Sequence, residues 1–128
     1  MTVPDNSYRT VTPYLLVPDA DAELDFLTTA FDANVTLCDR GDDGSVKHAE
    51  LRVGDSLIMI GQAGGEWKAL TGALYLWVPD VDATYAKAID AGAASQMPPE
   101  DKPYGHRSAG VVDRNHITWW IAAPVRAK

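Results

Sequence analysis

Tyr14-Leu15-Leu16-Val17-Pro18-Asp19-Ala20-Asp21-Ala22 recurs almost unchanged as Tyr75-Leu76-Trp77-Val78-Pro79-Asp80-Val81-Asp82-Ala83. The two copies lie 61 positions apart and agree at seven of nine positions. Each copy joins residues typical of a strand to aspartates that can cap a helix. A repeat at one fixed offset predicts a structural unit that is used twice.

The segments that follow the two copies repeat in the same order. After the first copy we expect a helix with Leu24, Leu27 and Phe31 on its apolar face, capped by Asp19 or Asp21. The strands expected in this half cover residues 10–17, 34–39, 45–53 and 56–62. The first half therefore has the order βαβββ.

The second half has the same pattern around the second copy. Its helix is capped by Asp80 or Asp82 and ends near Gly92, and Pro98-Pro99 follows a weak strand. The strands expected here cover residues 73–78, 94–97, 106–113 and 117–123. We therefore predict an α+β fold with two tandem βαβββ modules, at about 10–62 and 72–124, joined by a linker at 63–71.

Composition narrows the class of partner. The chain has 128 residues, the length of one domain, and a formal net charge of −7, which argues against nucleic acid. Cys38 is the only cysteine, so an intramolecular disulfide is excluded and a cytoplasmic location is expected. The polar segment 1–9 does not resemble a signal peptide, and no apolar run is long enough to span a membrane.

Several short motifs recur in a set order and spacing, namely Thr12–Leu15, His48–Asp55, Tyr104–Ser108, Asp113 and Trp119-Trp120. Together they resemble the vicinal oxygen chelate superfamily, also called the glyoxalase/bleomycin-resistance/dioxygenase superfamily, in its PhnB-like branch. This resemblance implies one domain over 1–128, in which each module forms a curled mixed sheet with its helix on the convex side. It also implies that two such cups enclose a ligand site, either within one chain or across a homodimer.

Metal-dependent members of that superfamily place metal ligands on the first and last strands of each module. The corresponding positions in this sequence are Thr12, Met59, Ala73 and Trp120. Alanine and tryptophan offer no donor atom to a divalent metal, and a thioether suits only soft ions. We therefore expect neither a metal site nor another cofactor.

Strand alternation predicts which side chains face the ligand. The set comprises Thr12, Tyr14, Met59, Tyr75, Trp77, Arg107 and Trp120. The aromatic members either line a site for a planar ligand or fill the cup as core. If the offset of 61 also holds for the third strand of each module, His48 corresponds to Ala109. Arg107 and Val111 are then predicted to face the ligand as well.

His48 and Glu50 share one side of the third strand and are the candidate acid–base pair. They can equally be a structural ion pair or simple ligand contacts. Three functions remain open: a metal-independent binding protein for an aromatic or planar compound, akin to the sequestering resistance proteins of the family; a metal-independent isomerase or lyase, with Arg107 holding an anionic oxygen; and a non-catalytic interaction module. We expect a small-molecule partner and a homodimer.

Overall fold

A computed structural model describes residues 9–125 of the chain and confirms the α+β fold with two βαβββ modules. The first module consists of β1 (Tyr14–Val17), α1 (Ala20–Phe31), β2 (Asn34–Arg40), β3 (Val46–Val53) and β4 (Ser56–Gln62). The second consists of β5 (Gly72–Trp77), α2 (Val81–Asp90), β6 (Ala94–Asp101), β7 (His106–Val112) and β8 (Ile117–Pro124). The chain divides into two compact units with the main boundary between Leu70 and Thr71, and residues 29–31 at the end of α1 belong to the second unit.

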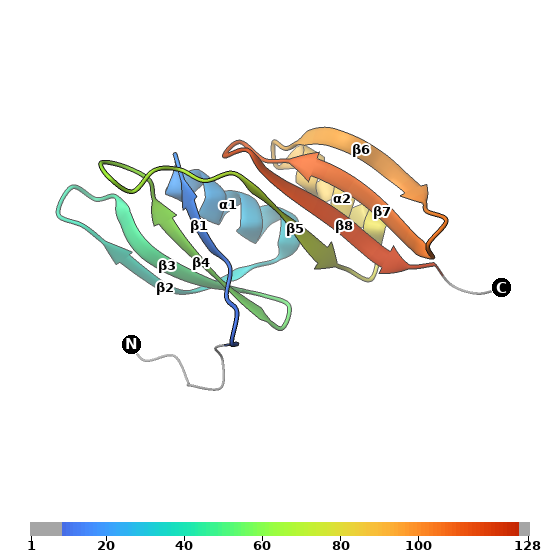
Figure 1. The fold of residues 1–128 in the computed structure, drawn as a ribbon, viewed down its shortest axis with the longest axis horizontal. Helices are drawn as coiled ribbons and strands as arrows, with labels where there is room; N and C mark the ends of the chain where they lie inside the picture. The colour runs from blue at the N-terminus through green and yellow to red at the C-terminus, as the bar shows by residue number, and fades with distance from the viewer. Residues whose placement is uncertain (1–8, 126–128) are drawn as a thin grey trace. The chain divides into compact units, whose positions relative to one another are not determined.

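The two sheets have the same strand order. It is β1-β4-β3-β2 in the first module and β5-β8-β7-β6 in the second. In each sheet the first strand is parallel to the last, and the repeat is preserved in the register, since Tyr14 pairs with Met59 and Tyr75 pairs with Trp120. Each helix lies behind its own sheet in Figure 1, which leaves the other face of that sheet uncovered by a helix. We call this uncovered side the open face of each module.

The structure identifies the helix caps that the sequence leaves ambiguous. Asp19 Oδ1 accepts a hydrogen bond from Ala22 N at 3.0 Å, and Asp80 Oδ1 accepts one from Ala83 N at 3.1 Å. Such a cap stabilises a helix by about 1 kcal/mol. The second aspartate of each copy instead binds an arginine of its own sheet: Asp21 binds Arg40, and Asp82 binds Arg107.

The offset between the modules is not constant along the chain. In β2 and β3 it is 60 rather than 61, since Asn34 pairs with Arg52 whereas Ala94 pairs with Val112. The shift arises because α2 is two residues shorter than α1, with 10 residues against 12, and the connection after it is one residue longer. Three residues separate Asp113 from its partner Ile117, whereas two separate Val53 from its partner Ser56, and this extra residue restores the offset of 61.

Strand β6 runs through the prolines that we expected to end it. It continues to Asp101 and includes Pro98 and Pro99. It is an edge strand that pairs only with β7, and the register shifts between Met97 and Glu100. An edge strand tolerates proline because the missing N–H can face away from the neighbouring strand. The turn that leads into β7 therefore begins after Asp101.

The helix-facing sides of the sheets form the core. Ala49, Leu51 and Val53 are buried on β3, as alternation predicts, and Leu24, Leu27 and Phe31 are buried on α1. In the second sheet Ala109, Val111, Ile117, Trp119 and Ile121 are buried. Within residues 9–125, no helix is long and apolar enough to cross a membrane.

Candidate functional site

A row of three residues crosses the middle of each open face. In the first module the row is Tyr14, Met59 and Glu50, on β1, β4 and β3. In the second module the corresponding row is Tyr75, Trp120 and Gly110, on β5, β8 and β7. The tyrosine is shared, whereas a carboxylate and a thioether in one module are replaced by a bare backbone and an indole in the other. The two open faces therefore have different chemistry.

The indole of Trp120 lies directly against Gly110. A Cβ at position 110 would come within 2.5 Å of Cζ3 and 2.8 Å of Cε3 of Trp120. Such distances are far inside van der Waals contact, so the ring keeps this position only because residue 110 has no side chain. Gly110 thus fixes Trp120 as part of the open face of the second module.

Three aromatic side chains gather around His106 on the same open face. Trp77 lies 4.8 Å from the His106 ring and Tyr104 lies 5.1 Å from it, both edge-on. Tyr75 is 5.2 Å from Trp77 and 6.2 Å from His106. We call Tyr75, Trp77, Tyr104 and His106 the aromatic cluster.

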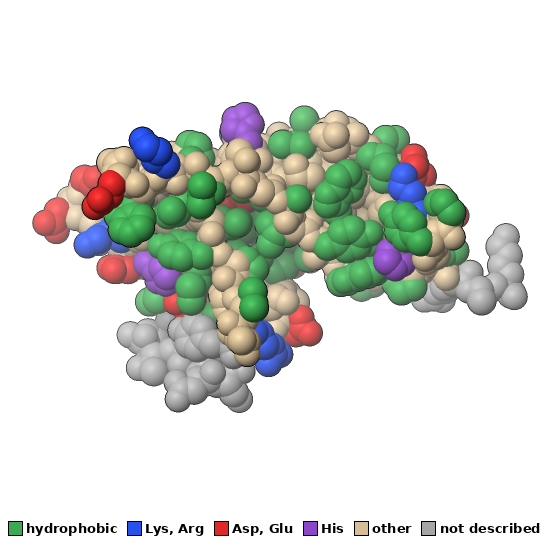
Figure 2. All heavy atoms as spheres, in the orientation of Figure 1, with side chains coloured by type: hydrophobic (Ala, Val, Ile, Leu, Met, Phe, Trp, Pro, Cys, Tyr) green, Lys and Arg blue, Asp and Glu red, His purple; other side chains and the backbone are tan. Residues whose placement is uncertain are grey.

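The aromatic cluster is exposed rather than used as core. Tyr75, Trp77 and Tyr104 keep 44%, 55% and 62% of their surface accessible. In the space-filling view of this side, hydrophobic side chains surround a histidine over the second sheet (Figure 2). Exposed aromatic rings in mutual contact provide a surface for stacking another flat molecule.

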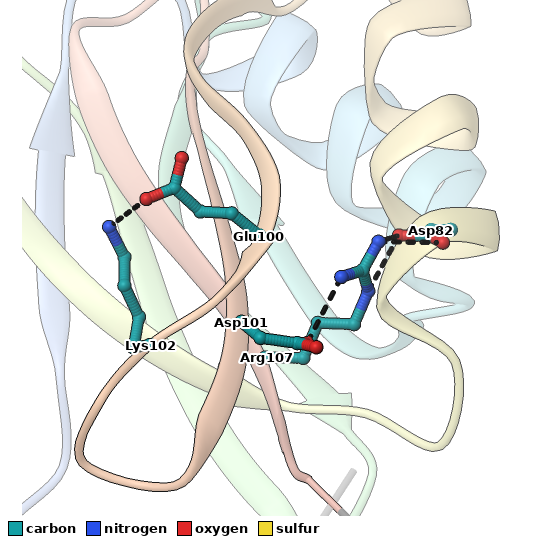
Figure 3. A network of polar contacts seen from close by, with 5 residues as sticks. All are labelled: Asp82, Glu100, Asp101, Lys102 and Arg107. Atoms are coloured by element: carbon teal, nitrogen blue, oxygen red, sulfur yellow. Dashed lines mark hydrogen bonds and ion pairs between the residues drawn. The ribbon is translucent and has the colours of Figure 1, made fainter.

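A polar group borders the aromatic cluster at the β6–β7 turn. Lys102 forms an ion pair with Glu100, and 22% of the Lys102 side chain is accessible. Figure 3 shows this pair on one side of the β6–β7 ribbon and Arg107, with Asp82 and Asp101, on the other. Burial and a hydrogen bond with Tyr104 raise the pKa of Tyr75 above its ordinary value of 10.0, and the nearby Lys102 ammonium partly opposes this rise.

The first module holds the candidate acid–base pair. His48 Nε2 lies 2.8 Å from Glu50 Oε2, and Glu50 is buried. This contact lets the Glu50 carboxylate accept a hydrogen bond from Nε2 in the tautomer that carries its hydrogen there, which leaves Nδ1 as the acceptor of a neutral ring. Tyr14 packs edge-on against His48 with 5.6 Å between ring centroids. The structure therefore brings together Tyr14, His48 and Glu50. Met59 lies between Tyr14 and Glu50 in the row.

Arg107 does not face the open side, and the expectation that it does is wrong. Its guanidinium binds Asp82 at the start of α2 and Asp101 on β6, with N–O distances of 3.0 to 3.1 Å. Ala109 and Val111 share its side of β7 and are buried towards the helix. The error comes from the constant offset of 61, since a slip of one residue exchanges the two faces of a strand.

The corrected register places Ser108 and His106 on the open face of β7. With an offset of 60, His48 corresponds to Ser108, and His106 lies two residues before Ser108 on the same face. Tyr104 belongs to the turn that leads into β7, where alternation gives no orientation. Thr12, by contrast, precedes β1, and its hydroxyl donates to the Arg9 carbonyl at 3.3 Å.

A family model described as the Glyoxalase/Bleomycin resistance protein/Dioxygenase superfamily matches residues 9–121. The chain belongs to this superfamily. An uncharacterized protein of Mycobacterium tuberculosis, Rv0887c, is 32% identical and covers 98% of this chain and 80% of its own length. TioX from Micromonospora sp. ML1 is 25% identical, with a TM-score of 0.78 over 92% of this chain and 100% of TioX. The PhnB protein of Bacillus cereus shares the fold at 18% identity, with a TM-score of 0.70 over 90% of this chain and 99% of that one.

The positions that hold metal in metal-dependent members of the superfamily carry unsuitable side chains in this chain. The register places Met59 beside Tyr14, and Trp120 beside Tyr75 with its ring against Gly110. Between residues 9 and 125, no three His, Cys, Asp or Glu side chains lie close enough to hold a metal ion. These residues do not fit the superfamily's metal centre, and independence of metal stays a prediction.

Proposed function

We propose that the protein binds a small planar or aromatic molecule without a metal, as the sequestering members of its superfamily do. The observation that supports this best is the aromatic cluster, in which three exposed rings surround His106 on the open face of the second module. A core residue would be covered, whereas these rings remain available for stacking. Trp120 adds a further ring on that face, and Thr12, Tyr14 and Met59 are the proposed ligand contacts of the first module.

Calorimetric titration with 2-naphthalenemethanol, a neutral planar probe, tests this proposal. We expect Trp77→Ala to weaken binding about tenfold, because loss of one stacking partner costs about 0.5–1.5 kcal/mol in addition to the lost buried area. Trp67→Ala is the matched control, because Trp67 is also an exposed tryptophan, 65% accessible against 55% for Trp77, and lies in the linker outside the cluster. Equal effects of the two variants, or no binding by the unaltered protein, would contradict the proposal.

We propose proton transfer at His48 as a second candidate function, that of a metal-independent isomerase or lyase. The supporting observation is the 2.8 Å contact that orients the ring through buried Glu50. Such an arrangement is typical of a general base. Arg107 has no part in this version, since it binds Asp82 on the helix side.

Deuterium uptake from solvent into hydroxyacetone, followed by proton NMR, tests the second candidate. We expect the unaltered protein to accelerate the exchange, His48→Gln to remove the acceleration, and Glu50→Gln to reduce it. An unchanged rate in His48→Gln would exclude His48 as the base. Retained binding of 2-naphthalenemethanol by that variant would show that the protein is folded.

We also propose a homodimer in the cytoplasm. The dimer is supported by exposed apolar side chains outside the open faces, namely Val11, Trp67 and Leu70. The location is supported by the free, exposed thiol of Cys38, which suits a reducing compartment. Light scattering after size exclusion should give twice the chain mass of 13.8 kDa, and a single-chain mass would contradict the dimer.

A further inference from the structure

Hydrogen-bond donors converge along one edge of the aromatic cluster. The Tyr75 hydroxyl lies 3.4 Å from Nδ1 of His106, and the Tyr104 ring packs against the same histidine with 5.1 Å between ring centroids. The positive charge of Lys102 acts against the raised pKa of Tyr75. Lys102 is also held across the turn from His106, because its backbone N–H donates to the His106 carbonyl at 2.7 Å. Two phenols and one ammonium therefore share this edge.

One ammonium and one carboxylate lie at this edge. Glu100 is the neighbouring carboxylate, and it already pairs with Lys102. Asp101 is the next acid along β6, but it points to the opposite side of the ribbon and binds Arg107 (Figure 3). The Tyr75 phenol is protonated at neutral pH even at the ordinary tyrosine pKa of 10.0, so it can donate, and burial raises that pKa further. A ligand that stacks on the rings thus meets donors at its rim.

We infer that the preferred ligand is a planar aromatic anion, whose rings stack on Trp77 while its carboxylate or phenolate oxygen binds Lys102, Tyr75 and Tyr104. This inference rests on the proposed binding function and specifies the class of molecule. Charge-assisted hydrogen bonds are about twice as strong as neutral ones. A cation would gain from the ring faces but meets the Lys102 ammonium, and a neutral ligand leaves the donors to water.

Three probes with the same ring system isolate the effect of charge. They are 2-naphthoate, 2-naphthalenemethanol and 2-naphthylmethylammonium, each titrated calorimetrically into the full chain at low salt. We expect 2-naphthoate to bind roughly tenfold more tightly than the neutral alcohol, and the ammonium compound to bind most weakly. Lys102→Met should remove most of this preference, whereas Lys47→Met, which removes an exposed lysine of the first module, should not.

A variant that is expected to bind more tightly distinguishes a lost contact from misfolding, because a misfolded protein does not gain affinity. Glu100→Gln removes the partner of Lys102, so its ammonium becomes available to the ligand. This variant should bind 2-naphthoate roughly threefold more tightly and leave the alcohol unchanged. Tyr104→Phe, which removes one hydroxyl but keeps the ring, should weaken only 2-naphthoate.

The outcomes separate the inference from the function on which it rests. If all three probes bind equally and Trp77→Ala abolishes binding, the planar-ligand function stands and the preference for an anion is wrong. Tighter binding of the ammonium compound, or an unchanged preference in Lys102→Met, would also overturn the inference. If no probe binds, or if Trp77→Ala has no effect on any of them, both proposals fail.

Discussion

Gly110 shows how one missing side chain shapes the open face of the second module. A Cβ there would overlap the Trp120 ring. We expect Gly110→Ala to displace the indole and to lower the free energy of unfolding by about 1–3 kcal/mol, the usual cost of overpacking. Urea unfolding measures the stability, and near-ultraviolet circular dichroism reports the changed setting of the indole.

The control for this variant lies in the same sheet. Gly72 begins β5, and a Cβ there meets nothing within 4 Å. Gly72→Ala should leave both the stability and the aromatic spectrum nearly unchanged. Equal effects of the two substitutions would mean that general strand propensity, rather than the contact with Trp120, requires glycine at position 110.

Asp113 fixes the turn between β7 and β8 through a buried carboxylate. Its Oδ2 accepts from Trp119 Nε1 at 2.9 Å, and its Oδ1 accepts from the backbone N–H groups of Asn115 and Ile117. Asp113→Ala leaves these buried donors without this acceptor, so we expect a loss of about 2–4 kcal/mol in unfolding free energy. Asp55→Ala, in the shorter exposed turn of the first module, should cost far less. Comparable losses would show that the buried acceptor is unimportant.

Among the strands and helices, the repeat predicted the elements well but not every face. The bounds of β4 follow from its apolar run between two turn signals. The orientation of β7 does not follow from the sequence. Helix α2 is two residues shorter than α1, so the offset between the modules changes at a point where the strand pattern gives no sign of it. An error of one residue in the predicted register placed Arg107 on the open side, whereas in the structure Arg107 binds Asp82 on the helix side. Alternation therefore predicts a face only where the local offset is known.

The orientation of Arg107 makes a prediction for ligand binding. Because it joins β7 to α2 on the side away from the aromatic cluster, Arg107→Gln should leave the affinity for 2-naphthoate unchanged. The same variant should unfold at a lower urea concentration, since it loses the ion pairs to two carboxylates. A selective loss of 2-naphthoate binding without a loss of stability would contradict this prediction and show that Arg107 contacts the ligand.

The ion pair between β2 and α1 predicts how stability depends on pH. Arg40 binds Asp21 at 2.7 Å, and this hydrogen bond lowers the pKa of Asp21 below its ordinary value of 3.8. A lowered pKa in the folded state contributes stability above the unfolded pKa, and the contribution is lost as the pH falls through the folded pKa. Asp21→Asn should therefore be less stable than the unaltered protein at about pH 6, and the difference should vanish toward about pH 2.

Urea unfolding at several pH values measures this difference. Asp25→Asn, which changes an exposed aspartate of the same helix, provides the control and should show a smaller dependence on pH. A constant difference between Asp21→Asn and the unaltered protein across the range would mean that the ion pair with Arg40 contributes nothing to stability.

For the whole chain, the repeated sequence predicts two like scaffolds but not their unlike surfaces. The two sequence copies are similar because each forms the same local structure, a strand followed by a helix cap and a helix. The aromatic cluster depends on Tyr104 and His106, which belong to a turn and to a strand whose register the repeat misplaces. Only the three-dimensional arrangement shows that these rings meet Tyr75 and Trp77.

The difference between the two open faces predicts the stoichiometry of binding. The second module presents Trp120 against bare backbone at Gly110, whereas the first places Glu50 and Met59 at the corresponding positions. A carboxylate disfavours an anionic ligand, so the first module should not form a second site of equal strength for 2-naphthoate. Calorimetry should therefore give one bound 2-naphthoate per chain. Two equivalent sites would show that the shared tyrosine, not the divergent row, determines binding, and one ligand for two chains would mean that a homodimer shares a single site.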